Sequence, residues 1–472
     1  MAASSSPLTL VIDQGTHSTR GLAFDADGRV QAAAVRPVAL RGYGADEVEQ
    51  DGAEIMASVQ QVVAEVLAHD AVRGRGLAQA GLTTQRSSVV AWDRRTGEPL
   101  APLLSWQDRR VAGWLAAFDQ HAALVKERTG LRLSPHYGAG KLRWLLDHVP
   151  AVAEAQRSGQ LAFGPLAAFI LFNLLRDRPL VVDHVNASRT QLWNLAHRDW
   201  DPWLLELFGV PAAPLPACQP ILHRYGQLQA ADVPVTAVNG DQNSAIYSLG
   251  RPKEGAAIVN MGTGAFILLL TGSRLVPHPA LLSGLASSSQ QGAEYLVEGT
   301  VNGAGAALQW AADLWALPDL TRRLAGWLAA ARTPPIFTNG IGGLGSPWWQ
   351  PGPGPQFIGE GEVPEKAVAV LESILFMLYA NLQAMLAAGL TVRQVQISGG
   401  LARLDGLCQR LADLAERPVY RPVETEATAR GLAWLAAGRP AHWPKPGRGR
   451  TFYPQPHPQL HERYHRFRGY ID

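Results

Sequence analysis

Two polar turns, each set between apolar runs, constrain the fold of this chain more than any other feature. The first turn contains Gly15 and Thr16 and joins the apolar runs 8–12 and 21–24. The second has the sequence Gly262-Thr263-Gly264 and joins two further apolar runs in the second half of the chain. Apolar runs joined by glycine-bearing turns predict β-hairpins. Their recurrence is a weak internal repeat, and it predicts two α/β domains that face each other across a cleft.

Helical patterns lie between and after the two predicted hairpins. Residues 54–67 are amphipathic, and residues 365–388 are long and strongly apolar. Leucines from Leu401 to Leu414 recur at spacings near those of a helix, which predicts another one there. The longest apolar stretch, 163–175, is too short to span a bilayer and predicts a buried helix. With the turn-rich segment 251–255 as punctuation, we place the domains at residues 1–249 and 250–472.

Composition excludes several classes of function. The net charge is +2 and the arginines are spread without a dense basic block, so we expect no nucleic-acid partner. The two cysteines, Cys218 and Cys408, have no disulfide or zinc-site spacing, which fits a reducing cytoplasm. Residues 1–7 lack the basic segment and apolar run of a signal peptide. We therefore expect a cytoplasmic protein with no membrane association.

The glycine turns have the chemistry of a phosphate site. Phosphate requires several N–H and hydroxyl donors and little side-chain bulk, which both hairpin turns supply. A third candidate is the pair Gly399-Gly400, which lies between the predicted strand 395–397 and a helix, where a ligand can approach backbone N–H groups. Each turn alone is more often an ordinary turn, but the three together favour phosphate binding. The sequence contains no P-loop motif.

Two aspartates at predicted strand ends are candidates for chemistry. Asp13 ends the first strand, and it either caps the turn or provides a carboxylate for Mg²⁺. Asp241 follows Gly240 after the predicted strand 235–238. It either caps a helix or acts as the general base that takes the hydroxyl proton in phosphoryl transfer to an alcohol. Residue type alone favours the capping role at both positions.

These segments, in this order, resemble the glycerol kinase branch of the FGGY carbohydrate kinases across nearly the whole chain. The resemblance is carried by Asp13-Gln14-Gly15-Thr16, Leu82-Thr83-Thr84-Gln85-Arg86, Trp106-Gln107-Asp108-Arg109-Arg110, Asn186-Ala187-Ser188-Arg189-Thr190, Gly240-Asp241-Gln242, Gly262-Thr263-Gly264, Gly399-Gly400 and Thr428-Ala429-Arg430-Gly431. Agreement at this density outweighs the separate capping interpretations. It implies two actin-like, ribonuclease H-like ATPase domains. It also implies a carbohydrate kinase that uses ATP and Mg²⁺ to phosphorylate a hydroxyl of a small polyol or sugar.

The resemblance also implies roles for individual residues. Asp241 would be the general base, and Asp13 would organise Mg²⁺. The implied acceptor-binding residues are Arg86, Ser87, Trp106, His136, Asp241, Gln242 and Phe266. The implied nucleotide-binding residues are Gly15, Thr16, His17, Ser18, Arg20, Gly262, Thr263, Gly305, Gln309, Gly399 and Gly400. The partners implied are ATP and a small polyol or sugar, and a homodimer is expected because dimers are common in the family.

Departures from the family pattern bear on the substrate. Ser87 stands where glycerol kinases have a glutamate that binds two glycerol hydroxyls, and His136 stands where they have a tyrosine. Loss of a buried charged acceptor costs about 1.5–3 kcal/mol, which disfavours glycerol and leaves room for a longer polyol or a ketose. On the nucleotide side, His17, Ser398 and Leu404 replace the usual threonine, aspartate and asparagine.

Several alternatives stay open at the level of sequence. One is a true glycerol kinase whose pocket compensates for Ser87, and another is a pentulose or ketose kinase such as a ribulose or xylulose kinase. The Met-His-Gly motif of xylulose kinases is absent. A third is a catalytically silent sugar-binding regulatory protein on the kinase scaffold, and a fourth is an actin-like ATPase or chaperone. Retention of Asp13 and Asp241 disfavours the silent protein, and the predicted acceptor pocket disfavours the ATPase.

Overall fold

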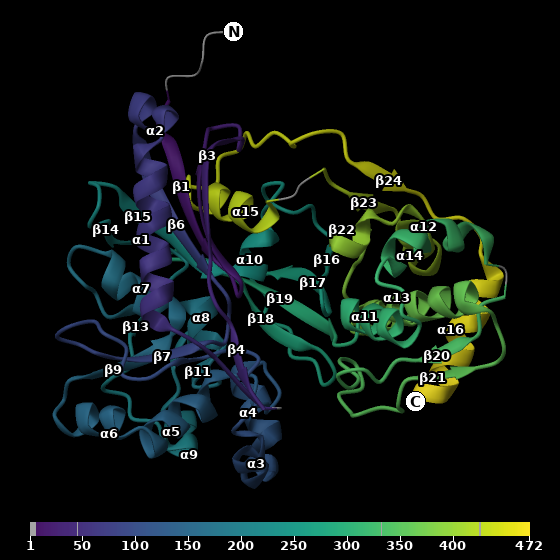
Figure 1. Cartoon of the computed structure of the whole chain (residues 1–472), viewed down its shortest axis with the longest axis horizontal. Helices are drawn as coiled ribbons and strands as arrows, with labels where there is room; N and C mark the ends of the chain where they lie inside the picture. Colours follow the sequence, from purple (N-terminus) through teal and green to yellow (C-terminus); the bar gives the residue numbers. More distant parts are fainter. Residues whose placement is uncertain (1–5, 45, 332, 424–425) are drawn as a thin grey trace. The chain divides into compact units, whose positions relative to one another are not determined.

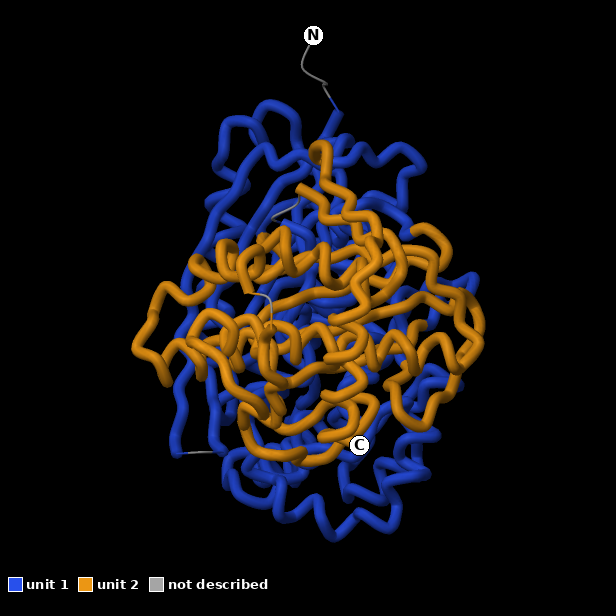
Figure 2. Tube along the Cα trace, turned by 90° about the vertical axis from the view of Figure 1, so that its right-hand side faces the viewer, with its two compact units in different colours: residues 1–252, 284–295, 425–445 blue, residues 253–283, 296–424, 446–472 orange. Residues whose placement is uncertain are grey.

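The structure, a computed structural model, describes residues 6–44, 46–331, 333–423 and 426–472. The chain divides into two compact units (Figure 2). The first unit contains residues 1–252, 284–295 and 425–445, and the second contains residues 253–283, 296–424 and 446–472. The units are thus interleaved along the chain, and a single functional boundary between residues 249 and 250 stays a prediction.

Within its described residues, the first unit is built on a six-stranded sheet with the order β14-β15-β6-β1-β2-β3 (Figure 1). Strands β1, β6 and β15 are parallel to one another, and β2, β3 and β14 are antiparallel to their neighbours. The strands are β1 (Leu8–Gln14), β2 (Ser18–Phe24), β3 (Val30–Pro37), β6 (Leu77–Thr84), β14 (Leu222–Gln227) and β15 (Pro234–Gly240). The hairpin predicted from the first glycine turn is confirmed as β1–β2.

Helices α1 (Gly52–Ala68) and α15 (Ala427–Ala436) cover opposite faces of this sheet. A Cβ at Gly21 would lie 3.0 Å from the Val62 carbonyl oxygen of α1, and one at Gly81 would lie 3.0 Å from Leu432 of α15. Gly21 is paired with Ile12 and Gly81 with Val11, so the two glycines face opposite sides of the pleated sheet. Asp13 shares the face of Val11, which places its carboxylate on the α15 side.

A second sheet of the first unit has the order β4-β5-β8-β7-β9. Its strands are β4 (Arg41–Tyr43), β5 (Glu47–Gln50), β7 (Val89–Asp93), β8 (Leu103–Leu104) and β9 (Leu161–Pro165). The short strands β10 (Val181–Asp183) and β13 (Ala217–Gln219) pair, as do β11 (Trp193–Asn194) and β12 (Asp199–Trp200). The other helices here are α2 (Asp70–Arg75), α3 (Ala112–Leu115), α4 (Ala122–Thr129), α5 (Gly138–His148), α6 (Pro150–Arg157), α7 (Leu166–Leu174), α8 (His184–Ser188), α9 (Pro202–Phe208) and α10 (Asp241–Ala245).

The buried helix predicted over residues 163–175 is partly wrong. Residues up to Pro165 form the end of β9, which pairs with β7, and only Leu166–Leu174 is helical. Pro165 has an extended conformation and precedes the first helical residue. An apolar run of this length fits a buried strand as well as a buried helix, and periodicity does not separate the two.

The second unit contains a sheet with the order β18-β19-β17-β16-β22-β23-β24 among its described residues. Its strands are β16 (Ala256–Met261), β17 (Ala265–Gly272), β18 (Leu282–Ser289), β19 (Gly292–Val301), β22 (Gln394–Gly399), β23 (Val419–Arg421) and β24 (Arg450–Phe452). Residues 284–295 of β18 and β19 belong to the first unit. A small sheet pairs β20 (Ile336–Thr338) with β21 (Gln356–Ile358). The helices are α11 (Gly305–Leu314), α12 (Leu320–Ala330), α13 (Val363–Ala387), α14 (Asp405–Ala415) and α16 (Pro458–Ile471).

Helix α13 forms the centre of the second unit's hydrophobic core and confirms the helix predicted at residues 365–388. It begins with a capping box in which Glu362 and Glu365 satisfy each other's backbone N–H groups. By length and composition α13 could cross a membrane, the one such helix in the described residues, but most of its apolar window is buried inside the protein. The continuous apolar surface therefore serves core packing.

The helix predicted over Leu401–Leu414 is interrupted in the structure. A 3₁₀ turn spans Gly400–Arg403, Leu404 is extended, and α14 starts at Asp405. Leu401, Leu404 and Leu407 are all buried despite the change in backbone conformation. The leucine spacing therefore predicted which side of the segment is buried, but it did not predict the interruption of the helix.

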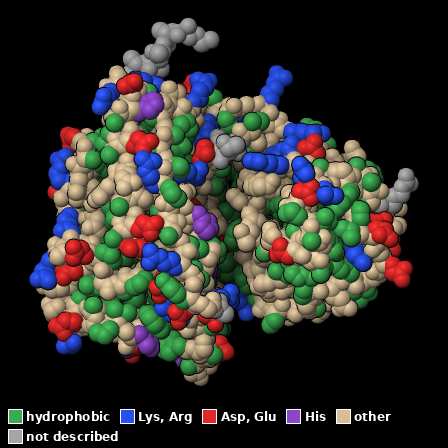
Figure 3. Space-filling model, viewed as in Figure 1, with side chains coloured by type: hydrophobic (Ala, Val, Ile, Leu, Met, Phe, Trp, Pro, Cys, Tyr) green, Lys and Arg blue, Asp and Glu red, His purple; other side chains and the backbone are tan. Residues whose placement is uncertain are grey.

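The two central sheets repeat one topology, as the two glycine turns predicted. β1 pairs antiparallel with β2 and parallel with β6, and β16 pairs antiparallel with β17 and parallel with β22. Lys and Arg side chains are interspersed with Asp and Glu over the face seen in Figure 3. That distribution agrees with the small net charge of the sequence.

Candidate active site

The carboxyl ends of three parallel strands bring the first group of predicted site residues together in the first unit. Asp13 near the end of β1 is level with Thr83 of β6, and Thr84 of β6 is level with Gly240 of β15. Arg86 follows β6 and Asp241 follows β15, so both lie at the same edge of the sheet as Asp13. Ligand sites of open α/β sheets lie at such edges.

Asp13 is nearly fully buried and is paired with a cation. Arg20 donates one hydrogen bond to Asp13 and another to Glu426, which precedes α15. Burial raises the pKa of Asp13 to about 6, although the charge and hydrogen bond of Arg20 oppose the rise and the charge of Asp241 adds to it. A carboxylate in this state gains from a further positive charge, which is the condition for a cation ligand.

The turn after β1 presents the other predicted phosphate residues of the first unit. The Gly15 N–H donates to the Ser18 carbonyl at 2.9 Å, and His17 is exposed. The Thr16 carbonyl accepts from the buried Gln50 at 2.9 Å, and its hydroxyl accepts from the Trp106 indole N–H at 3.0 Å. The turn is therefore held from two other segments of the unit.

Arg86 is fixed beside Asp241 by amide oxygens. Its guanidinium donates to Asn243 at 2.9 Å and to Gln242 at 2.6 Å, and its Nε lies 3.9 Å from Asp241 Oδ1. A Cβ at Gly240 would lie 2.7 Å from the Arg86 side chain, so a larger residue here would force that side chain to shift. Gly240 therefore lets the arginine cross the end of β15.

The Asp241 carboxylate is accessible but little solvated. Its side chain is 33% exposed, and Oδ1 accepts the Gln242 N–H at 2.7 Å. Burial raises the pKa of Asp241 above its ordinary value, while the charge of Arg86 acts against that rise. Among the described residues, α10 has Gly240 as its N-cap and no side-chain capping hydrogen bond, so the helix-capping interpretation of Asp241 is wrong. Its carboxylate keeps an open side that is available for chemistry.

Three predicted acceptor residues lie around the loop that contains Arg86, namely Ser87, Trp106 and His136. Ser87 has a left-handed backbone with φ 67° and is 3% exposed. Its hydroxyl has no hydrogen-bond partner among the described residues. The His136 ring meets Trp106 edge to face at 5.6 Å, and burial together with nearby positive charges lowers the pKa of His136 well below its usual range. His136 is thus a neutral ring beside Trp106.

Several residues at this edge were given no role from the sequence. Asn243 binds Arg86, Glu426 binds Arg20, and Gln85 links Gln50 at 2.8 Å. Lys141 is fully buried in α5, in phase with the buried Gly138, Leu142 and Leu145. A lysine on the apolar face of a predicted helix is a signal that sequence reading could have used.

The second unit gathers the other predicted nucleotide residues around its glycine turn. The turn between β16 and β17 and the start of α11 are joined by backbone bonds, from the Gly305 N–H to the Gly262 carbonyl at 3.0 Å and from the Ala306 N–H to the Thr263 carbonyl at 3.0 Å. A Cβ at Gly305 would lie 2.6 Å from the Gly262 oxygen. Only glycine permits this close approach of the helix to the turn.

The glycine pair after β22 provides exposed backbone next to the same strand. Gly399 has φ 96°, and a Cβ there would lie 2.3 Å from the Met261 oxygen of β16. A Cβ at Gly400 would meet no atom of the described residues within 4 Å. Gln309 is exposed and donates to Asp313 in its own helix, and Phe266 is half-buried on β17 of the second unit. The turn and the glycine pair thus lie at the carboxyl ends of neighbouring parallel strands.

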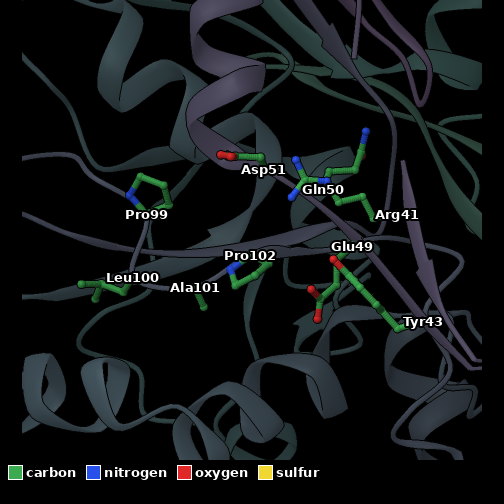
Figure 4. A pocket seen from close by; sticks show the side chains of 10 residues that line it. Arg41, Tyr43, Glu49, Gln50, Asp51, Pro99, Leu100, Ala101 and Pro102 are labelled. Atoms are coloured by element: carbon green, nitrogen blue, oxygen red, sulfur yellow. The ribbon is translucent and has the colours of Figure 1, made fainter. Parts of the chain in front are cut away.

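A shallow groove of about 280 Å³ lies beside β5 in the first unit (Figure 4). It is lined by Arg41, Tyr43, Glu49, Gln50, Asp51, Gly52, Pro99, Leu100, Ala101 and Pro102. Glu49 already accepts from Arg110, Gln50 from Gln85, and Asp51 caps α1. None of the predicted site residues lines this groove.

A metal ion at this sheet edge would have few protein ligands. Within the described residues, no three His, Cys, Asp or Glu side chains converge as a metal cage. Mg²⁺ is commonly held by one or two carboxylates together with waters and substrate phosphates. Asp13, beside a donor-rich turn and electrostatically coupled to Asp241, fits that mode of binding.

Comparisons with known proteins match the chain over most of its length. The FGGY family of carbohydrate kinases matches with its N-terminal domain at residues 8–247 and its C-terminal domain at residues 257–438. The chain is 38% identical over 445 residues to a glycerol kinase of Alkalilimnicola ehrlichii, covering 91% of this chain and 89% of that protein. It is 36% identical over 449 residues to a glycerol kinase of Alcanivorax borkumensis, covering 91% and 89%.

Solved structures show the same fold. A Plasmodium falciparum glycerol kinase with ADP has a TM-score of 0.90 at 22% identity and covers 98% of this chain and 97% of its own. A xylulose kinase from Rhodospirillum rubrum has a TM-score of 0.86 at 21% identity and covers 98% of both chains. The predicted fold class, two actin-like ATPase domains, is confirmed by these likenesses.

Proposed function

The chain belongs to the FGGY family of carbohydrate kinases, and from that premise we propose that its acceptor is a polyol or ketose longer than glycerol. The kinase class itself, ATP-dependent phosphorylation of a polyol or sugar hydroxyl, follows from the family and its relatives. The observation that carries the proposal is the Ser87 hydroxyl, which is buried beside Arg86 in the acceptor region and has no hydrogen-bond partner in the part of the chain that the structure describes.

An unpartnered buried hydroxyl is a cost that a bound ligand can remove. Buried polar groups in native proteins are nearly always hydrogen-bonded, so such an exception points to an absent partner. Ser87 Oγ can accept from and donate to a substrate hydroxyl. Because serine is shorter than the glutamate found at this place in glycerol kinases, the acceptor can extend further toward Ser87.

Asp241 is proposed as the general base. When the acceptor oxygen forms its bond to the γ-phosphorus, the hydroxyl proton passes to the Asp241 carboxylate, and the bond from phosphorus to the ADP oxygen breaks. A pKa above the ordinary aspartate value supports this role because it makes the carboxylate a stronger proton acceptor. Arg86, held by Gln242 and Asn243, would bind acceptor hydroxyls and keep the carboxylate in place.

Asp13 is proposed to hold Mg²⁺, alone or through a water molecule. When bound, the ion neutralises charge on the transferred phosphoryl group. The N–H and hydroxyl groups of Gly15, Thr16 and Ser18 would bind phosphate oxygens from the same side. On the second unit, the backbone of Gly262, Thr263 and Gly400 is proposed to bind the nucleotide, with Gly305 and Gly399 keeping that backbone close.

Glycerol is the second candidate acceptor. It is favoured by the names of the relatives, which are glycerol kinases at 35–38% identity. The replacement at Ser87 works against it, because a charged acceptor in a buried site contributes about 1.5–3 kcal/mol.

A coupled ADP-release assay with Mg-ATP separates these candidates. The panel contains glycerol, erythritol, four- to six-carbon polyols, D- and L-ketopentoses, ketohexoses and gluconate. We expect the highest kcat/KM for a member with four or more carbons. A clear preference for glycerol over every longer member would contradict the proposed acceptor and leave the kinase class intact.

A cytoplasmic location and a homodimer are carried forward as proposals. The two cysteines are unpaired, Cys408 being buried and Cys218 half-buried, which suits a reducing compartment. Light scattering coupled to size exclusion at micromolar concentration tests the dimer, and a monomer mass would reject it.

A further inference from the structure

One buried ammonium group connects three segments of the acceptor region. Lys141 lies on α5 and is fully buried. Its Nζ donates to the backbone carbonyls of Ser105 at 2.6 Å, His136 at 2.9 Å and Ser87 at 3.2 Å. An ammonium has three N–H donors, so these carbonyls use all of them.

Each of the three carbonyls belongs to a segment that carries a predicted acceptor residue. Ser87 and His136 are such residues themselves, and Ser105 directly precedes Trp106. The segments come from different parts of the first unit, after β6, after β8 and before α5. The ammonium is the point at which their positions relative to one another are set.

Of the three carbonyls, that of Ser87 belongs to the residue with the least favourable backbone conformation. Ser87 has φ 67°, a conformation that residues other than glycine rarely adopt and that needs support from its surroundings. The hydrogen bond from Lys141 provides such support on the backbone side, while the Ser87 hydroxyl has no partner among the residues described. Loss of the ammonium would let the loop relax and move that hydroxyl.

Burying a lysine side chain costs free energy, and packing of its alkyl chain alone does not account for its presence here. Lysine is almost never fully buried without a charged partner, and no carboxylate among the described residues forms an ion pair with Lys141. Burial lowers the pKa of Lys141 to about 7, with the charge of Asp108 raising it and that of Arg110 lowering it. A methionine would fill similar space without that cost, so the three donors are what the lysine adds.

We propose that Lys141 is a positioning residue that fixes the acceptor pocket and thereby sets its preference among polyols and sugars. It touches no substrate atom and acts through Ser87, Trp106 and His136. This inference rests on the proposed function, since it assigns the acceptor region to those residues.

The test compares Lys141→Met with a matched control, Lys126→Met. Lys126 is a half-buried lysine on α4 of the same unit and has no part in the site. For Lys141→Met we expect the ratio of kcat/KM between the best acceptor and one a carbon shorter to change about tenfold, with KM for ATP little changed. An equal loss for every acceptor would reduce Lys141 to a structural residue and overturn the proposal.

Amide hydrogen exchange provides a readout that does not depend on the acceptor. In Lys141→Met, peptides covering 85–90, 103–108 and 134–137 should exchange faster, and a peptide covering 394–400 of the second unit should not. Unchanged exchange in all three segments would overturn the proposal even if activity fell. If wild type accepts no member of the panel, the proposed function fails, and the exchange result still decides the role of Lys141.

Folding of the variant is the remaining control. If Lys141→Met does not accumulate as folded protein, Lys141→Gln, which retains a shorter donor, takes its place in both measurements. Failure of both variants to fold would assign Lys141 to stability and also overturn the positioning role.

Discussion

The first hairpin, β1–β2, and the second, β16–β17, share a topology but differ in chemistry. In the first, Asp13 is paired with Arg20 across the hairpin and with Thr83 on the parallel strand. The corresponding pairing in the second hairpin joins Asn260 with Phe266 and with Ser398. The first unit thus presents an ion pair at the place where the second presents only neutral side chains.

In the second unit, glycines and the backbone they expose take the place that charged side chains have in the first. Gly305 and Gly399 bring backbone segments within distances that exclude a Cβ, and Gly400 leaves open backbone. The first unit adds a further carboxylate, Asp241, and the cation Arg86. The comparison teaches that one architecture can serve two tasks: buried charges suit metal and proton chemistry, while exposed backbone suits the binding of a nucleotide.

The largest expected effect comes from removing a charge from the first unit. Asp241→Asn should lower kcat by about 10³-fold because the acceptor hydroxyl loses its proton acceptor, while ATP affinity stays near wild type. Steady-state kinetics and calorimetric ATP titration measure the two quantities. Asp232→Asn, a change at an exposed carboxylate of the same unit, is the control. Near-normal turnover in Asp241→Asn would remove the proposed base.

The next largest effect concerns the exposed glycine backbone of the second unit. Gly400→Ala should weaken ATP binding about 30-fold, or about 2 kcal/mol, with little loss of stability because a Cβ at Gly400 would meet no atom of the described residues within 4 Å. Isothermal titration and thermal unfolding check the pair of outcomes. Gly326→Ala, in the exposed part of α12, should only raise stability, by about 1 kcal/mol. Unaltered ATP affinity in Gly400→Ala would separate this glycine from the nucleotide.

A pH titration sharpens the role of Asp13. Its pKa of about 6 means that the folded protein holds a proton there at pH values where an ordinary aspartate, near 3.8, has lost it. A protonated carboxyl is no cation ligand, so the apparent affinity for Mg²⁺ should fall about tenfold per pH unit below 6 and level off above it. Mg²⁺ dependence of the rate at several pH values measures this. A flat affinity from pH 5 to 7 would exclude Asp13 as the ligand.

The same shift carries a stability consequence with a defined sign. Between about pH 3.8 and 6 the folded state binds more protons at Asp13 than the unfolded state, so this group lowers the free energy of unfolding as pH rises through that window. Asp13→Asn should remove this contribution, which denaturant unfolding at pH 4 and 7 can compare.

The smallest expected effect concerns the acceptor specificity of the first unit. Ser87→Glu should raise kcat/KM for glycerol about fivefold relative to longer acceptors, because it restores a charged hydrogen-bond acceptor beside Arg86. Ser87→Ala is the control that removes the hydroxyl without adding charge. If glycerol gains nothing in Ser87→Glu, the acceptor pocket differs from that of glycerol kinases in more than this group.

Sequence patterns predicted the framework better than its local details. The two glycine turns predicted the repeated hairpins, and apolar periodicity predicted α1 and α13, because alternation and helical spacing are local properties. They missed the strand at 161–165 and the break at Leu404, where buried apolar residues look alike in either conformation. The roles of the predicted site residues stay predictions, although the first unit does bring Asp13, Arg86 and Asp241 to one sheet edge.

The sequence by itself determined which residue types stand at strand ends and turns, and through its motifs it determined the family. Those are properties of neighbouring residues, and local backbone preferences are enough to express them. Only the tertiary structure decided that Ser87 is left-handed, with a hydroxyl that finds no partner within the described ranges, that Arg20 joins Asp13 to Glu426, and that Lys141 binds three carbonyls. Several of these contacts join residues far apart in the chain, and the burial that shifts the pKa values of Asp13 and Lys141 exists only once the sheets and helices have packed.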